Sequence, residues 1–163
     1  MNPSLAELTE RHRGEILSYL GRLLGDRQEA EDACQEAFLR AHRAFGRLGP
    51  EANFRAWLYR IATNTGLSAS RRRSRRRARA ADVDPDALPA ASVSSLERRE
   101  ELRAVRRAVE ALPPRQRAAL VLRRFHGLGY AEIAATVGGS EATARANVYQ
   151  AVRRLRAVLG ESR

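Results

Sequence analysis

The chain has 163 residues and a net charge of +11, and all 30 of its basic residues are arginines. A hydrophobic fraction of 44% is enough to build a core, which argues against wholesale disorder. The aromatic fraction is only 6%, and alanine and leucine supply most of the apolar residues, so the composition favours helices and excludes an all-β sandwich. Cys34 is the single cysteine, which excludes an intrachain disulfide and a cysteine-rich metal site, and we expect no cofactor and no metal.

The positive charge is distributed unevenly along the chain. Residues 1–70 hold nine arginines and nine acids, whereas residues 71–81 hold seven arginines and no acid. Residues 82–101 hold six acids and two arginines, and residues 102–163 hold twelve arginines and four acids. The sequence therefore predicts a neutral module, a basic segment, an acidic stretch and a basic module, which is unlike a protein that coats nucleic acid uniformly.

The acidic stretch has the composition of a flexible linker. Residues 81–95 combine two prolines with small residues and serines and show no helical periodicity. We therefore expect a first module over residues 1–77, a linker over residues 78–96 and a second module over residues 97–163.

Three amphipathic helices are predicted in the first module. Apolar residues recur three or four positions apart over residues 5–24, and Gly25 marks the end of this helix. Residues 26–45 open with an acidic first turn and place alanines on one stripe, with polar side chains on the other face. Residues 53–65 follow a Gly-Pro break, and their apolar face consists of Phe54, Trp57, Leu58 and Ile61. The three helices should enclose one small core.

Several residues of this module have ordinary structural interpretations when taken alone. The polar face of the second helix is typical of a solvated surface, Trp57 of a core residue, and Cys34 of a small buried apolar residue. The three histidines, His12, His42 and His126, are scattered, and nothing near them in sequence indicates catalysis or metal binding.

The second module contains a predicted helix–turn–helix. The first helix of this unit runs through Ile133 and Val137, and Gly138-Gly139 supplies the turn. Ser140 is a favourable N-cap for the second helix. The buried face of that helix is predicted to hold Ala144, Val148, Ala151, Val152, Leu155 and Leu159, and its outward face Thr143, Arg145, Ala146, Tyr149, Gln150 and Arg153.

This outward face has the chemistry of a DNA-reading helix. The second helix of such a unit lies in the major groove, where arginine reads guanine and glutamine reads adenine through paired hydrogen bonds. Arg123 and Arg124 precede the unit and are expected to contact phosphates. A generic amphipathic helical hairpin would give similar apolar spacing, but the glycine turn, the N-cap and the excess of arginine favour the helix–turn–helix.

Together, the two modules resemble bacterial RNA polymerase sigma factors of the small, two-region extracytoplasmic-function (ECF) group of the sigma-70 family. Residues 29–45 resemble the family's polymerase-binding helix, residues 53–76 its segment that recognises and melts the minus-10 element, and residues 111–156 its region that binds the minus-35 element. The helix–turn–helix alone occurs in many regulators, whereas all three segments in this order are specific. The resemblance implies an all-α fold of two small helical domains, a region 2 bundle of three to four helices and a region 4 helix–turn–helix, joined by the linker.

The resemblance also implies which residues make the contacts. On the polymerase-binding helix these are Asp32, Gln35, Glu36, Phe38 and Arg40. In the family, a loop after the Trp-containing helix holds a flipped promoter base, and by position this loop is Asn64, Thr65, Gly66, Leu67 and Ser68, followed by Arg71, Arg72 and Arg73 for backbone phosphates. The outward face of the helix–turn–helix, with Arg123 and Arg124, would read the minus-35 element.

Some positions depart from the family pattern. Ser68 stands where many members carry an aspartate, which leaves the base preference at that position open. Residues 142–147 read Ala-Thr-Ala-Arg-Ala-Asn where Gly-Thr-Val-Arg-Ser-Arg is common, so Ala146 and Asn147 replace a serine and an arginine. Gln150 also stands where an arginine is common. We expect weaker contacts in the second module and an unusual minus-35 sequence.

The implied function is promoter-specific transcription initiation in the cytoplasm, without a catalytic site. The implied partners are promoter DNA, an anti-sigma factor, and core RNA polymerase, through the clamp coiled coil of its largest subunit and its flap. Residues 1–20 contain no apolar run long enough for a signal peptide or a membrane span, so we expect no membrane insertion. We also hypothesise that the linker acids Asp82, Asp84 and Asp86 mimic nucleic acid near the RNA path.

Two other function classes remain open from the sequence. A stand-alone helix–turn–helix regulator would leave the first module unexplained. An arginine-rich RNA-binding or nucleoid protein would need a continuous basic surface, which the neutral first module does not offer.

Overall fold

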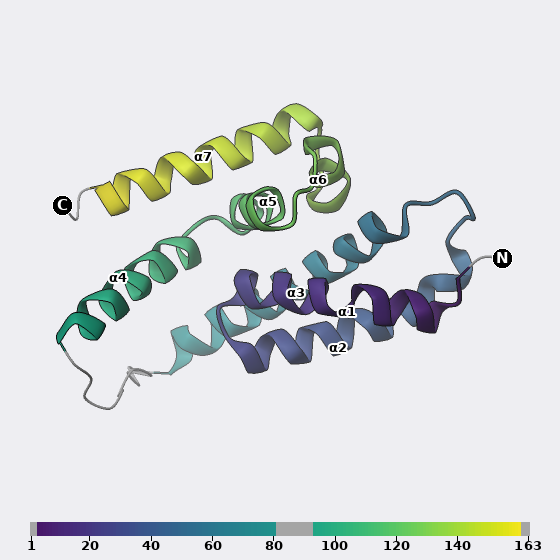
Figure 1. Ribbon diagram of the computed structural model, residues 1–163, viewed down its shortest axis with the longest axis horizontal. Helices are drawn as coiled ribbons and strands as arrows, with labels where there is room; N and C mark the ends of the chain where they lie inside the picture. The colour runs from purple at the N-terminus through teal and green to yellow at the C-terminus, as the bar shows by residue number, and fades with distance from the viewer. Residues whose placement is uncertain (1–2, 81–92, 161–163) are drawn as a thin grey trace.

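The computed structural model describes residues 3–80 and 93–160, and the described residues form helices and no strands (Figure 1). The predicted all-α fold is therefore confirmed. The elements are α1 (Leu5–Leu24), α2 (Arg27–Ala44), a 3-10 turn η1 (Phe45–Arg47), α3 (Phe54–Arg79), α4 (Val93–Glu110), α5 (Pro114–Phe125), α6 (Tyr130–Val137) and α7 (Glu141–Gly160). Most of the expected linker, including Asp82, Asp84 and Asp86, lies outside the described residues.

The first two helices begin and end where the sequence places them. Ser4 caps α1 in a capping box, in which its backbone N–H donates to the Glu7 carboxylate over 2.7 Å. Gly25 ends α1 in the left-handed region at φ 68°, and the Asp26 side chain accepts from the Glu29 backbone N–H at the start of α2.

The core of the first module is built from small residues on α2 and larger residues on α1 and α3. The α2 stripe Ala30, Ala33, Ala37 and Ala41 is buried, as the sequence predicts. From the other two helices come Ile16, Tyr19, Leu20, Leu23, Leu58, Tyr59 and Ala62. Alanine adds little width to α2, so α2 lies close against α1 and α3, and its polar residues face outward.

Helix α3 is longer than predicted, and the loop expected over residues 64–68 is wrong. The helix continues to Arg79, and its Thr65 hydroxyl donates to its own Ile61 carbonyl over 2.8 Å. A Cβ atom on Gly66 would lie 2.9 Å from the Cδ2 atoms of both Leu20 and Leu23. Gly66 therefore marks the close packing of α3 on α1 rather than a turn.

The helix–turn–helix of the second module is confirmed in its geometry. Gly138 and Gly139 have φ values of 98° and 94°, which side-chain-bearing residues rarely adopt. The Ser140 hydroxyl accepts from the Thr143 backbone N–H over 3.1 Å at the start of α7. On the predicted inner face of α7, Ala144 and Ala151 are fully buried, whereas the larger residues are half-buried because α7 lies at the surface of a small module.

The two modules pack against each other. One buried cluster of apolar side chains extends from Ile16 and Leu58 in the first module to Leu122 and Ile133 in the second. Helix α5 packs on α1 and α6 packs on α3, so α5, α6 and α7 form a layer beside the three-helix bundle (Figure 1). The outer faces of α2 and α7 point away from this contact.

Candidate functional site

The α2 residues chosen from the sequence lie on the exposed side of that helix. Asp32, Gln35 and Arg40 are exposed, while Glu36 and Phe38 are half-buried. The Arg40 side chain donates to the Glu36 carboxylate over 2.9 Å, one turn earlier. Leu39 is 46% exposed beside them and was missed by sequence reasoning, although an apolar residue outside the alanine stripe was a signal. The result is a face with an apolar centre and charged surroundings, of the kind that binds protein.

The residues expected to hold a promoter base are only partly accessible. Asn64 is exposed and Leu67 and Ser68 are half-buried, but Thr65 and Gly66 are buried inside the bundle. Those two therefore cannot contact a base in this structure. Irregular backbone of the first module lies instead before α3, in the exposed stretch 49–53, whose signal in the sequence was Gly-Pro.

The arginines that follow have different surroundings. Arg72 is exposed, and Arg71 donates to the Ser68 hydroxyl over 3.1 Å. Arg73 turns toward the junction of α1 and α2, where it donates to the Leu24 carbonyl over 2.8 Å and to the Glu29 carboxylate of α2 over 3.3 Å. Arg73 thus satisfies the carbonyl end of α1, which leaves Arg71 and Arg72 as the residues of this group that face solvent.

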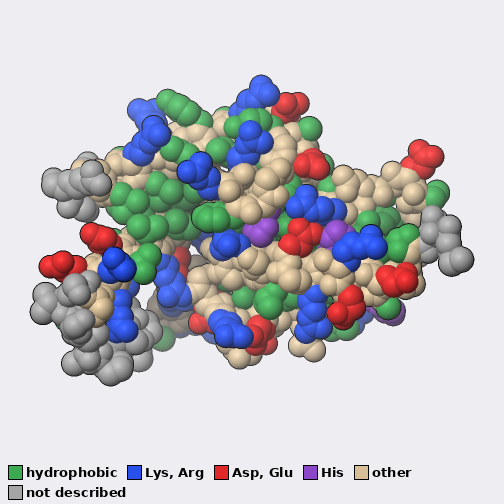
Figure 2. Space-filling model, in the orientation of Figure 1, with side chains coloured by type: hydrophobic (Ala, Val, Ile, Leu, Met, Phe, Trp, Pro, Cys, Tyr) green, Lys and Arg blue, Asp and Glu red, His purple; other side chains and the backbone are tan. Residues whose placement is uncertain are grey.

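The outward face of α7 is assembled as the sequence predicts. Thr143, Arg145, Ala146, Tyr149, Gln150 and Arg153 are all exposed, Tyr149 with 65% of its surface. Figure 2 shows arginine side chains along the α7 side of the molecule, whereas acidic and basic side chains are interspersed over the first module. This distribution agrees with the uneven charge in the sequence and gives α7 the potential that DNA phosphates favour.

Arg123 and Arg124 lie in the last turn of α5 and are both exposed. Arg123 also has a structural role, because it donates to the Leu128 carbonyl over 3.2 Å. Its guanidinium carbon lies 4.4 Å from the centre of the Tyr130 ring.

A polar cluster connects the two modules. The Tyr59 hydroxyl donates to Glu15 over 2.9 Å and shares a 3.0 Å hydrogen bond with the Nδ1 atom of His126. Arg55 donates to the Glu15 carboxylate over 3.1 Å and to the His126 carbonyl over 3.2 Å. Sequence reasoning found no role for His126, because its partners lie more than sixty residues away.

The protonation of this cluster follows from its burial. Burial alone would raise the pKa of Glu15, but hydrogen bonds from Arg55, His12 and Tyr59 outweigh it and lower this pKa. Burial and the nearby Arg22 and Arg55 lower the pKa of His126, against the opposing effect of Glu15. Since Tyr59 donates to Glu15, His126 donates to the Tyr59 hydroxyl from Nδ1. Its Nε2 is buried without a partner, and a proton there would be an unsatisfied charged donor, so this burial and the lowered pKa both favour the neutral ring. The cluster is therefore built around a neutral histidine.

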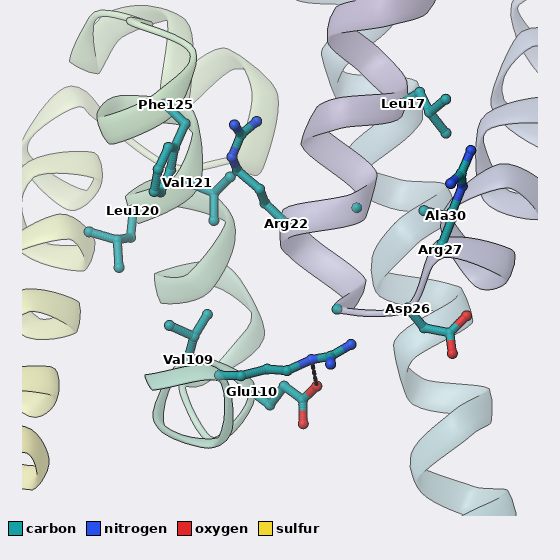
Figure 3. Close-up of a pocket in the computed structure, with 13 residues that line it drawn as sticks. Leu17, Arg22, Asp26, Arg27, Ala30, Val109, Glu110, Leu120, Val121 and Phe125 are labelled. Carbon is teal, nitrogen blue, oxygen red and sulfur yellow. Dashed lines mark ion pairs between the residues drawn. The ribbon is translucent and has the colours of Figure 1, made fainter. Parts of the chain in front are cut away.

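A groove of about 630 Å³ lies between the modules, next to this cluster (Figure 3). Leu17 of α1 and Leu120, Val121 and Phe125 of α5 line it, and Arg22 of α1 reaches across it to the Phe125 ring. Charged side chains stand at its rim, including the ion pair between Arg106 and Glu110, whose Nε and Oε1 atoms are 3.6 Å apart. The groove has an apolar floor and a charged rim, which suits an amphipathic helix.

Within residues 3–80 and 93–160, no cluster of three or more metal-ligating side chains occurs. No helix of the same residues is long and apolar enough to cross a membrane.

Comparison with known proteins identifies the family. The family models for sigma-70 region 2 and sigma-70 region 4 match residues 8–76 and 102–155. RNA polymerase sigma-H factor of Pseudomonas aeruginosa is 36% identical over 157 residues, which cover 88% of this chain and 80% of that protein. The chain belongs to the sigma-70 family, in its ECF group. Sigma factors are transcription initiation factors rather than enzymes, and the stand-alone regulator is not favoured.

Other relatives agree with this assignment. ECF RNA polymerase sigma factor SigE of Mycolicibacterium smegmatis is 36% identical over 162 residues, and the chain spans only 63% of its length. Among solved structures, CnrH in complex with the cytosolic domain of CnrY has a TM-score of 0.71 at 25% identity, over 98% of this chain and 89% of that one. The sigma factor RpoE of Bartonella quintana, solved with the anti-sigma factor NepR, has the same fold, with a TM-score of 0.72 at 24% identity, over 97% of this chain and 98% of that one.

Proposed function

We propose that this ECF sigma factor binds core RNA polymerase in the cytoplasm and directs it to promoters with a minus-10 and a minus-35 element. The observation that supports this most directly is the pairing of two exposed faces on separate modules of one chain, the protein-binding face of α2 and the DNA-reading face of α7. Run-off transcription with purified core polymerase on a fragmented genomic library tests it. Specific transcripts that require the chain support the proposal, and their absence refutes it.

The α2 face is the proposed contact with the clamp coiled coil of the largest polymerase subunit. Asp32, Gln35, Glu36, Phe38 and Arg40, with the newly found Leu39, offer polar and charged groups around an apolar centre. All of these side chains are at least partly accessible while the two modules remain packed together. Polymerase can therefore bind the first module before the second module moves.

The exposed side of α3 is the proposed minus-10 surface. Asn64 can hydrogen-bond a base edge, and Arg71 and Arg72 can bind the strand backbone. Because Thr65 and Gly66 are buried, a base that leaves the stack needs another site, and the exposed stretch 49–53 supplies the irregular backbone for it. Replacing Asn64 with alanine and, separately, Asn53 with alanine would show which of the two holds the base.

The α7 face is the proposed minus-35 surface. Arg145, Gln150 and Arg153 can bond base edges or phosphates, and the exposed Ala146 and Tyr149 can contact thymine methyl groups. Ala146 stands where a serine is common, and Asn147 and Gln150 stand where arginines are common. These changes remove contacts that many family members offer. Selection of bound sequences from a randomised minus-35 region would read out the altered preference.

The groove between the modules is the proposed docking site of an anti-sigma factor. Its apolar floor joins Leu17 of the first module to Phe125 of the second, so a helix lying in it would hold both modules at once. The CnrH neighbour was solved with the cytosolic domain of CnrY bound, and an analogous partner would suit this groove. Replacing Leu17 with aspartate should weaken binding of such a partner and leave polymerase binding unchanged.

The modules themselves are proposed to act as region 2 over residues 1–77 and region 4 over residues 97–163. Residues 78–96 would then connect them, although α4 already begins at Val93.

A further inference from the structure

Tyr130 is the first residue of α6, and two arginines lie over its ring. The guanidinium carbon of Arg123 is 4.4 Å from the ring centre, and that of Arg145 is 5.0 Å away. The two arginines come from different helices, α5 and α7, and both belong to the proposed minus-35 surface. Tyr130 thus connects the helix before the helix–turn–helix with the recognition helix itself.

The ring is held in place by its local structure. The backbone N–H of Gly129 donates to the Glu132 carboxylate over 2.9 Å, which fixes the start of α6. Arg123 donates to the Leu128 carbonyl, two residues before the ring, so this arginine is anchored as well. Tyr130 is half-buried and packs against the apolar core, whereas the Arg145 side chain is 62% exposed. The ring is therefore the fixed member of the stack and Arg145 the mobile one.

Arg145 has one other partner, and that partner competes with DNA. Its guanidinium donates to the Glu141 carboxylate over 3.1 Å, in an exposed pair of the kind that stabilises weakly. A guanine edge or a phosphate would take over the same N–H groups. The ring of Tyr130 instead attracts the face of the guanidinium and leaves its N–H groups free to donate.

We propose that Tyr130 is a positioning residue for minus-35 recognition, which holds Arg145 in the direction of the DNA through a cation–π contact. This inference rests on the proposed function. It places the specificity of α7 partly in α6. The loss of two common polar contacts at Ala146 and Asn147 makes the orientation of the remaining arginine more important.

The test is a double-mutant cycle in holoenzyme assembled from core polymerase and the full chain, on a promoter duplex. Tyr130→Phe keeps the ring and should bind as the wild type does. Tyr130→Leu should weaken binding about two- to fivefold, the effect of an exposed cation–π contact. In an Arg145→Ala background the same Tyr130→Leu change should have no further effect.

The other outcomes are equally informative. If Tyr130→Leu weakens binding as much with Arg145→Ala as without it, or if Tyr130→Phe loses as much as Tyr130→Leu, the positioning role is refuted. A loss that disappears only with Arg123→Ala also refutes it, because the ring would then act through the wrong arginine. If wild-type holoenzyme fails to select any promoter, the proposed function itself is wrong.

A second inference follows from the contact between the modules. The minus-10 and minus-35 elements differ by about 25 positions, as their names say. At about 3.4 Å per base pair they lie roughly 85 Å apart along straight DNA. A compact chain of this length has a radius of gyration of about 15 Å. The packed modules therefore cannot contact both elements at the same time. We infer that the cluster of Glu15, Arg55, Tyr59 and His126 is a latch that is closed in the free chain and released on polymerase.

The contact between the modules can be weakened by removing a single hydroxyl group. The Tyr59 hydroxyl contacts the second module, whereas the hydroxyl of Tyr19 bonds Thr63 within the first module over 2.7 Å. Tyr19→Phe removes only the bond to Thr63 within the first module. Tyr59→Phe removes the bond to Glu15 within the first module and also the bond to His126 between the modules. Loss of that bond leaves a polar partner unsatisfied, which should increase the ratio of open to closed chain about tenfold.

Energy transfer between two fluorophores measures the separation. In a chain with Cys34→Ala, cysteines introduced by Glu10→Cys on α1 and Ala157→Cys on α7 carry the dyes at exposed positions. We expect high transfer in the free chain, low transfer with core polymerase, and an intermediate value for free Tyr59→Phe but not for Tyr19→Phe. Equal transfer with and without polymerase, or equal shifts in the two variants, would overturn the latch.

Discussion

Replacing Gly66 with alanine tests whether the centre of α3 is packed core or accessible base-binding backbone. The new Cβ would lie 2.9 Å from two leucine methyl carbons, on Leu20 and Leu23, which are both buried. Overpacking of this kind costs about 1–3 kcal/mol. The change from glycine to alanine inside a helix returns about 1 kcal/mol. The variant should therefore be up to about 2 kcal/mol less stable than the wild type.

Gly14 offers a matched control, because it lies inside α1 with nothing within 4 Å of a new Cβ. Gly14→Ala should gain the helix contribution of about 1 kcal/mol without the packing cost. The difference in free energy of unfolding between the two variants, about 1–3 kcal/mol, then isolates the packing of Gly66. Urea unfolding followed by the fluorescence of Trp57, the only tryptophan, reports on α3 directly. Equal stabilisation in both variants would contradict the structure and restore the loop predicted from the sequence.

The remaining predictions concern binding and pH. Changing both Gln35 and Glu36 to alanine should weaken core-polymerase binding about tenfold and leave the circular dichroism spectrum unchanged. Arg27→Ala, on the first turn of the same helix, removes only a pair with Glu31 and should bind normally. Undiminished holoenzyme assembly by the Gln35 and Glu36 variant would rule out the α2 face. Asn64→Ala should reduce the permanganate reactivity of promoter thymines about tenfold more than it reduces duplex binding, and an equal loss in both assays would indicate a positioning role. Because burial lowers the pKa of His126 in the closed form, the ordinary pKa of about 6.5 returns when the modules separate. Acidification below that value should therefore favour the open form, and energy transfer should fall as the pH drops. A His126→Gln chain should lose this pH dependence. A pH response that survives the substitution would assign the effect to another group.

The sequence predicted helices correctly where the signal is local. Gly25 acts within one turn of its own position, so the end of α1 was predicted from the residue type. The same holds for the turn at Gly138-Gly139, since only a positive φ is required there. The resemblance to a family added the role of the exposed face of α2, which periodicity alone left as solvated surface, whereas the helix–turn–helix pattern by itself already indicated DNA reading by α7.

The prediction failed at Gly66 because one residue type has two uses. A glycine permits a turn, but it also permits another helix to approach closely. The sequence does not say which of these two uses applies at a given glycine. The decision is made by Leu20 and Leu23, more than forty residues earlier. Arg73 is similar, because its partner Glu29 lies forty-four residues away and turns a residue of the basic segment inward.

The sequence by itself determined the all-α class, the two modules, the exposed faces of α2 and α7 and the uneven charge, since these depend on periodicity and composition. Only the tertiary structure showed that the modules pack together, that His126 is held neutral between Tyr59 and Glu15, and that Tyr130 lies under Arg145. Each of these contacts joins residues from different helices. Periodicity tells which face of a helix is apolar, but the partner of that face is chosen by the shapes and charges of all the helices packing at once.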